Sequence, residues 1–109
     1  MTIIRFYLAS KDRNGEDISP EKLEFWRNTV EKAFALKFGG FTEFETTGGY
    51  LNQKGCLIVE KTLVIESHTE KFSNLDSVAL KYWAYAVKCD LRQETVMIQA
   101  IETEKTEFV

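Results

Sequence analysis

Five side chains of this sequence carry the chemistry that we expect of a binding site. They are Thr42, Tyr50, Glu60, Gln93 and Glu94. Two carboxylates, an amide, a hydroxyl and a phenol can orient a small polar ligand, or contact a protein partner, through hydrogen bonds. The sequence pairs no acid with a base at a recognisable spacing, so we expect no catalytic residue among them.

Glu60 is the first of these candidates, because it stands in the middle of an expected strand that is rich in apolar residues. We expect its side chain on the sheet face away from the helices, in a small polar groove. Partial burial there would raise the pKa of the carboxyl group unless a lysine or an amide compensates. The simpler interpretation is a solvated carboxylate that pairs across the strand with a lysine or a threonine.

Gly48 and Gly49 stand directly before Tyr50, inside an expected strand. Two glycines in a strand favour a β-bulge or the close approach of another chain segment. We predict that the missing side chains leave a gap beside Glu60 with Tyr50 as its wall. Gln93 reaches this gap if the last strand lies alongside. A bulge with a purely structural role is the alternative interpretation.

Other residues that often carry chemistry do not form a site in this sequence. Cys56 and Cys89 have no metal-ligand spacing and the single histidine is His68, so we expect reduced thiols that pack as small apolar residues. Gly39 and Gly40 follow an expected helix instead of preceding one, which argues against a phosphate-binding loop. We therefore expect no metal and no cofactor.

The composition excludes several classes of partner. The 109-residue chain has a net charge of −3 and no basic cluster, which disfavours nucleic acid. The expected third strand also lacks the aromatic residues of an RNA-binding ferredoxin-like domain. No stretch approaches the roughly 18–20 apolar residues of a membrane span, and the first ten residues do not resemble a signal peptide. We expect one cytoplasmic domain over residues 1–109, with a charged tail at about 104–109 that frays.

Turn-forming residues and hydrophobic periodicity predict four strands and two helices. The strands are expected at about 2–9, 42–50, 56–67 and 95–103, and the helices at about 20–37 and 74–89. Residues 52–55 supply a hairpin turn between the second and third strands. The order β-α-β-β-α-β predicts an α+β ferredoxin-like fold, in which both helices pack on one face of a four-stranded antiparallel sheet.

The ends of both expected helices carry capping residues. Ser19 and Pro20 begin the first helix and Gly39 ends it. Ser73 and Asp76 form a capping box at the start of the second helix. The first helix presents one apolar stripe, made of Leu23, Trp26, Val30, Ala33 and Phe34.

Two further sets of residues are expected to face the core. On the second helix these are Leu75, Ala79, Tyr82, Ala86 and Cys89, widened by Val78, Trp83 and Tyr85. On the third strand they are Leu57, Val59, Lys61, Leu63 and Ile65, because this alternate set is more apolar than its neighbour.

Several short motifs resemble a pattern in a group of small uncharacterised bacterial and phage-associated proteins. The matching segments are FGGFT at 38–42, Gly49-Tyr50, Gly55 followed by Glu60, and Gln93-Glu94 with Val96. In that group the tyrosine position is often tryptophan, preceded by glycine. The resemblance implies the same fold and groups the five candidate residues, but it implies no reaction.

Two functions fit this architecture. The first is a non-enzymatic protein-interaction or ligand-sensing module, a homodimer formed through the helix-free sheet face, which a partner must cover. Another protein or a small ligand is an alternative partner. The second is a small cofactor-independent enzyme of the dimeric α/β-barrel type. It would need a deep pocket between helices and sheet with His68, Tyr82 or Glu60 pointing into it. We favour the first, and expect a binding site instead of an active site.

Overall fold

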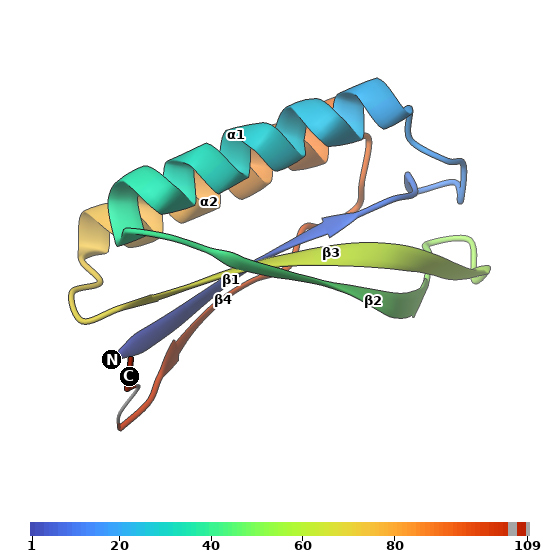
Figure 1. The fold of residues 1–109 in the computed structure, drawn as a ribbon. Coiled ribbons are helices and arrows are strands. Elements are labelled where there is room, and N and C mark those ends of the chain that lie inside the picture. Colours follow the sequence, from blue (N-terminus) through green and yellow to red (C-terminus); the bar gives the residue numbers. More distant parts are fainter. Residues whose placement is uncertain (105–106, 109) are drawn as a thin grey trace.

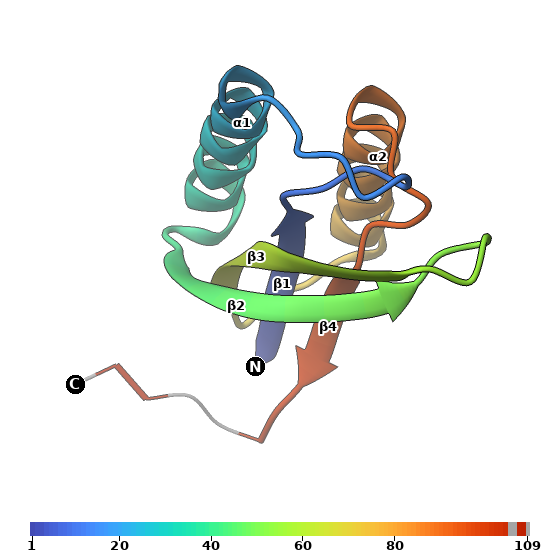
Figure 2. The same ribbon diagram turned by 90° about the vertical axis from the view of Figure 1, so that its right-hand side faces the viewer.

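The computed structural model describes residues 1–104 and 107–108. In chain order its elements are β1 (Thr2–Ala9), α1 (Pro20–Phe38), β2 (Thr42–Leu51), β3 (Leu57–Thr69), α2 (Asn74–Asp90) and β4 (Ile98–Glu102). The strands form one antiparallel sheet in the order β2-β3-β1-β4. Both helices lie on the same side of this sheet (Figures 1 and 2). This is the ferredoxin-like α+β fold that the sequence predicts. The expectation of a fraying tail concerns in part residues 105, 106 and 109, which lie outside the described residues.

Local signals set the helix ends as predicted. The Ser19 side chain accepts a hydrogen bond from the Lys22 N–H, and Gly39 closes α1 with a φ of 89°. That left-handed conformation is open to glycine at little steric cost. The complete capping box between Ser73 and Asp76 begins α2. No helix within the described residues is long and apolar enough to cross a membrane.

The core lies between the two helices and the facing side of the sheet. Its fully buried side chains are Ile4, Phe6, Val30, Phe34, Ile65 and Val87. Val30 and Phe34 come from the predicted stripe of α1, and Leu23 and Trp26 pack against them while partly exposed. Full burial of one such side chain stabilises the fold by about 1.5–3 kcal/mol, so this layer holds the helices on the sheet.

Most of the predicted core stripe of α2 is wrong, although Trp83 packs against the core as expected. Leu75 and Tyr82 are 79% and 71% exposed. The residues that face the core are instead Leu80, Ala84 and Val87, followed by Leu91. The helix carries apolar residues on two opposite sides, and periodicity alone does not say which side the sheet covers.

The faces of β3 agree with the prediction only where helices lie above the strand. Leu63 and Ile65 pair with Leu8 and Phe6 and join the core. Leu57, on the same face, is 67% exposed. The β2–β3 hairpin reaches past the helices, so no helix covers its tip (Figures 1 and 2).

Candidate functional site

A groove of about 420 Å³ opens on the sheet face away from the helices, and we call it the sheet groove. It lies where β1 ends, where the chain enters β4, and beside the distal half of β2 and β3. Its lining residues are Tyr7, Ala9, Lys11, residues 46–50, Glu60, Thr62, Gln93 and residues 95–97. The structure therefore brings together three of the five candidates, Tyr50, Glu60 and Gln93, beside the two glycines.

The register of the β2–β3 hairpin creates the space in this groove. Gly48 pairs directly with Glu60, and Tyr50 pairs with Ile58. The pairing continues without interruption through Gly49, so the predicted β-bulge is wrong. A Cβ atom at Gly48 would meet the Thr62 hydroxyl at 3.4 Å. The missing side chain thus opens the sheet surface directly opposite the Glu60 carboxylate.

Glu60 is buried, and its one hydrogen bond among the described residues comes from the backbone. Its side chain is 8% exposed, and its Oε2 atom accepts a hydrogen bond of 2.9 Å from the Lys11 backbone N–H. No ion pair to this carboxylate forms among the residues that the structure describes. Burial raises the pKa of Glu60 above 4.5, against the opposing effects of the Lys11 N–H and the Lys11 charge. A solvated strand carboxylate is therefore excluded.

Tyr50 supplies the wall of the groove and a neutral hydroxyl. Burial raises its pKa above 10.0, and the negative charges of Glu60, Glu94 and Asp12 raise it further. The phenol therefore stays protonated at physiological pH and is able to donate a hydrogen bond. A neutral donor and an anionic acceptor consequently lie in the same cavity.

Gln93 and Glu94 lie at the entrance to β4 but serve different places. The buried Gln93 amide donates to the backbone oxygens of Ala9 and Lys11, at 3.1 and 3.2 Å. Glu94 Oε1 accepts a hydrogen bond from the Gln53 N–H at 3.1 Å and holds the hairpin turn. Glu94 therefore acts on the groove through its charge, and it is not a lining residue.

Thr42 is not brought to the sheet groove. It lines a different cavity of about 430 Å³ at the other end of β2, together with Glu66, His68 and Phe108. The strand order explains this result, because Thr42 and Tyr50 stand at opposite ends of one ten-residue strand. At about 3.3 Å per residue they lie roughly 26 Å apart.

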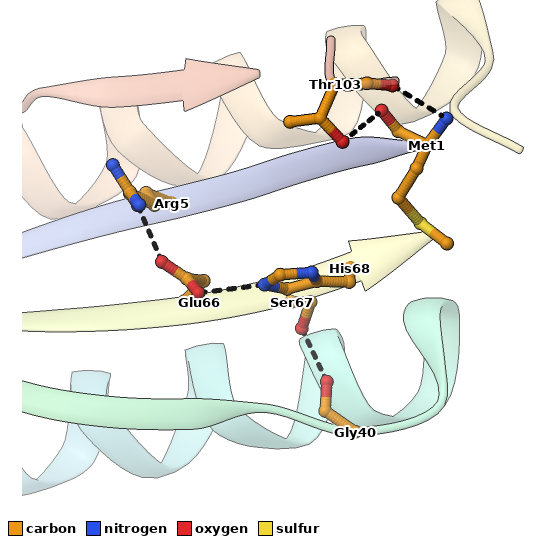
Figure 3. Close-up of polar contacts among 7 residues, drawn as sticks. All are labelled: Met1, Arg5, Gly40, Glu66, Ser67, His68 and Thr103. Atoms are coloured by element: carbon orange, nitrogen blue, oxygen red, sulfur yellow. Dashed lines mark hydrogen bonds and ion pairs between the residues drawn. The ribbon is translucent and has the colours of Figure 1, made fainter. Parts of the chain in front are cut away.

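Glu66 marks this other end of β3 and has a hydrogen-bonding neighbour on each side, Arg5 and His68 (Figure 3). Its Oε2 atom accepts a hydrogen bond of 2.6 Å from Arg5 Nε, and its Oε1 atom lies 2.9 Å from His68 Nε2. Burial alone would raise the pKa of Glu66. The hydrogen bonds from His68 and Arg5, with the Arg5 charge, outweigh burial and lower the pKa below 4.5.

Sequence reasoning missed Lys11 and Tyr7 as residues of the sheet groove. Lys11 contributes its backbone N–H, which no residue-type pattern reveals. The one available signal was its place just after the first strand, two residues beyond Ala9. The enzyme alternative expected a pocket between helices and sheet, and a cavity of about 300 Å³ does lie between α1 and the sheet, but His68, Tyr82 and Glu60 do not line it. Tyr82 is exposed on the outer side of α2.

The cysteine prediction is corrected in one respect. Cys56 and Cys89 are free thiols, and both are exposed instead of packing as small apolar residues. Across residues 1–104 and 107–108, no three His, Cys, Asp or Glu side chains gather closely enough to hold a metal ion. The chemistry of the sheet groove therefore rests on a carboxylate, phenols, an amide and backbone groups.

Comparison with known proteins gives a likeness of fold. The sequence matches no protein-family profile and no curated protein. Among solved structures, it is similar to a phage SAM lyase in complex with S-methyl-5'-thioadenosine, with a TM-score of 0.63 and 18% identity. It is also similar to a phage SAM lyase in the apo state, with a TM-score of 0.60 and 16% identity. Each alignment covers 97% of this chain and 92% of the other.

This likeness overturns our main functional prediction, a non-enzymatic interaction or ligand-sensing module, while the homodimer that we expected with it is not tested. The neighbours that share the fold over almost the whole chain are enzymes. They favour the alternative, a small enzyme, over the interaction module. The groove holds a buried carboxylate that forms no ion pair within the described residues. Such a groove is more typical of an enzyme than of a flat protein-contact surface.

Proposed function

We propose that this chain is a small lyase that binds S-adenosylmethionine, or a closely related thioadenosine sulfonium, in the sheet groove. The observation that carries the proposal is the buried Glu60 carboxylate, which lines a cavity of about 420 Å³ and forms no ion pair within the described residues. The shared fold of the phage SAM lyases supports it. One of these structures is a complex with S-methyl-5'-thioadenosine, the thioadenosine part of the ligand that we expect.

The chemistry of the groove suits a cationic nucleoside. A sulfonium carries one positive charge, and a carboxylate at the protein surface attracts such a charge more strongly when water is partly excluded. Tyr7 and Tyr50 line the same cavity and offer aromatic rings, whose faces also attract cations. The ribose hydroxyls of the same ligand are donors that a carboxylate accepts well. Glu60 is therefore the anchor that we expect for this ligand.

The reaction needs no metal and no oxidant. A lyase breaks a carbon–sulfur bond of the sulfonium, and the electron pair of that bond goes to sulfur, which leaves as a neutral thioether. The remaining carbon chain closes on an internal nucleophile or loses a proton, so no water is consumed. Because the positive charge disappears, the product loses its ionic attraction to Glu60 and keeps only the hydrogen bonds of its ribose hydroxyls. The same carboxylate therefore favours the substrate over the product and assists product release.

The finer predictions from the sequence stay proposals. The resemblance to bacterial and phage-associated proteins agrees with the phage source of both structural neighbours. A cytoplasmic location agrees with a substrate that cells make and use internally. Self-association through the open sheet face, where Phe44 and Met97 are 41% and 53% exposed, is a separate proposal. A solution mass measurement tests it.

The decisive experiment combines binding and turnover. Calorimetry with S-methyl-5'-thioadenosine should show one saturable site per chain, and adenosine, which lacks the thioether, should bind more weakly. Incubation with S-adenosylmethionine should release S-methyl-5'-thioadenosine, detected by mass spectrometry, in the presence of chelator. A protein that neither binds the thioadenosine nor consumes the sulfonium would overturn the proposed function.

A further inference from the structure

The buried Gln93 amide of the groove donates its hydrogen bonds to backbone oxygens. Its Nε2 atom donates to Ala9 O at 3.1 Å and to Lys11 O at 3.2 Å, and the side chain is 6% exposed. A primary amide has two N–H donors, so both are used. Both N–H donors of Gln93 therefore bond to residues 9–11 at the end of β1, and neither is left for a ligand.

That same segment delivers the hydrogen bond to Glu60. The Lys11 N–H donates to Glu60 Oε2 at 2.9 Å, while the Lys11 carbonyl accepts from Gln93. The segment thus lies between an amide on one side and a carboxylate on the other. No other donor contacts the Glu60 carboxylate among the described residues, so Oε1 remains as the acceptor for the groove.

Other bonds hold the flanks of this segment. Ser10 N–H donates to Lys61 O and Ile18 N–H donates to Ser10 O, at 3.1 and 3.0 Å. These contacts tie residue 10 to β3 and to the loop. The Ala9 and Lys11 carbonyls, however, receive side-chain bonds from Gln93. These two partly buried carbonyls flank the Ser10–Lys11 peptide unit whose N–H reaches Glu60. Without the Gln93 donors both carbonyls would turn toward water or another donor, and the peptide unit between them would shift.

We infer that Gln93 is a positioning residue for Glu60, which it orients through the Lys11 peptide without touching the ligand. The consequence for the ligand rests on the proposed function, in which Glu60 is the anchor. The consequence for Glu60 itself does not. The charged or titratable groups that act on Glu60 are Lys11 and Tyr50. Because the Lys11 N–H stabilises the ionised carboxylate, its displacement should leave the effect of burial opposed only by the Lys11 charge, and the pKa of Glu60 should rise.

The test is Gln93→Met, which keeps the length of the side chain and removes both donors. Carboxyl-carbon NMR titration of the ligand-free protein should show the pKa of Glu60 rising by about one unit, the effect expected for one lost hydrogen bond to a charged group. The pKa of Glu66 in the same sample should stay constant and serves as the internal reference. Gln99→Met is the matched control, since Gln99 is bonded to Tyr7 and not to residues 9–11.

Two further measurements separate the alternatives. In a Lys11→Pro background, which lacks the N–H, Gln93→Met should add no further shift. In the wild-type protein, the Lys11 amide signal should titrate with the pKa of Glu60, so the inference stays testable even if a variant does not fold. An unchanged Glu60 pKa in Gln93→Met, or a Lys11 amide that ignores the titration, would overturn it. Affinity for S-methyl-5'-thioadenosine should fall about tenfold; absent binding in wild type would count against the proposed function alone.

Discussion

Two glutamates on one strand of this protein have opposite surroundings. Glu60 and Glu66 both belong to β3 and, six residues apart, point to the same sheet face. Glu66 is held by Arg5 and His68 (Figure 3). Glu60 receives one backbone N–H, from Lys11, and no ion pair from the described residues. The pKa of Glu66 is lowered as a result, and the pKa of Glu60 is raised.

This difference indicates that Glu66 stabilises the fold, whereas Glu60 is available to bind a ligand. A buried charge must be compensated, and at Glu66 the protein supplies the compensation itself. At Glu60 the compensation is incomplete, and the strand partner is Gly48, which leaves a space. Across from Glu66 stands Thr42. The incompletely compensated charge of Glu60 and the space beside Gly48 lie at the same end of the sheet. A cationic ligand bound in that space would compensate the charge.

The largest expected effect is on ligand binding. Glu60→Gln keeps the shape of the side chain but removes its charge, and a hydrogen bond to a charged group is worth about 1.5–3 kcal/mol. Affinity for S-methyl-5'-thioadenosine or S-adenosylmethionine should fall roughly ten- to a hundredfold, as measured by calorimetry. Glu66→Gln, the matched change at the other end, should leave affinity within about twofold. Equal losses in both variants would erase the distinction between the two carboxylates.

The second effect is on folding stability, and here Glu66 should matter more than Glu60. Glu66→Gln removes the negative charge of the carboxylate to which Arg5 and His68 both bond. The Arg5 guanidinium then lacks its ion-pair partner. We expect the free energy of unfolding at pH 7 to fall by about 1–3 kcal/mol in urea titrations. Glu60→Gln should not destabilise, because it removes an uncompensated buried charge while its amide oxygen still accepts from Lys11. A stable Glu66→Gln protein would mean that the cluster contributes nothing to the fold.

Local signals made most of the fold predictable, and long-range contacts limited the site. The caps at Ser19 and Ser73 and the turn at 52–55 depend on neighbours within a few residues, and all appear as expected. The covered side of α2 depends on where the sheet lies, so its two apolar sides were not distinguishable.

The candidate site shows the same limit. Tyr50, Glu60 and Gln93 share a groove because hairpin register and strand order bring them together. Thr42 was grouped with them by motif, although it pairs with Glu66 at the far end. The contacts of Gln93 span 84 and 82 residues of sequence, which places them beyond any local pattern.

A third effect is the pH dependence of stability, with opposite signs for the two residues. The pKa of Glu60 is raised on folding, so its contribution is present below its unfolded value near 4.5 and is lost as pH rises through the folded value. The pKa of Glu66 is lowered, so its contribution is present above 4.5 and is lost as pH falls through the folded value.

Urea titrations between pH 3 and 7 should reveal both trends, each within about 1.4 kcal/mol for one pKa unit. Glu60→Gln should gain stability relative to wild type as pH rises above 4.5. Glu66→Gln should lose its disadvantage as pH falls below 4.5. Parallel curves for the two variants would contradict the opposite pKa shifts.

The smallest expected effect comes from the residues across the strand. Gly48→Ala and Thr42→Ala place the same methyl group opposite Glu60 and Glu66. The new Cβ at position 48 would meet the Thr62 hydroxyl at 3.4 Å, a tight contact at the floor of the sheet groove. Affinity for S-methyl-5'-thioadenosine should therefore fall about threefold, or roughly 0.7 kcal/mol.

Gly48→Ala should increase the stability of the protein although it lowers the affinity for the ligand. Gly48 has no positive φ, so alanine fits its backbone, and the loss of unfolded-chain entropy should stabilise the protein by about 0.4–1 kcal/mol. Thr42→Ala should leave affinity unchanged, because Thr42 lines the other cavity. Calorimetry and urea titration on both variants measure the two quantities. A groove that tolerates the extra methyl without any loss of affinity would show that the ligand does not use the space which Gly48 leaves beside Glu60.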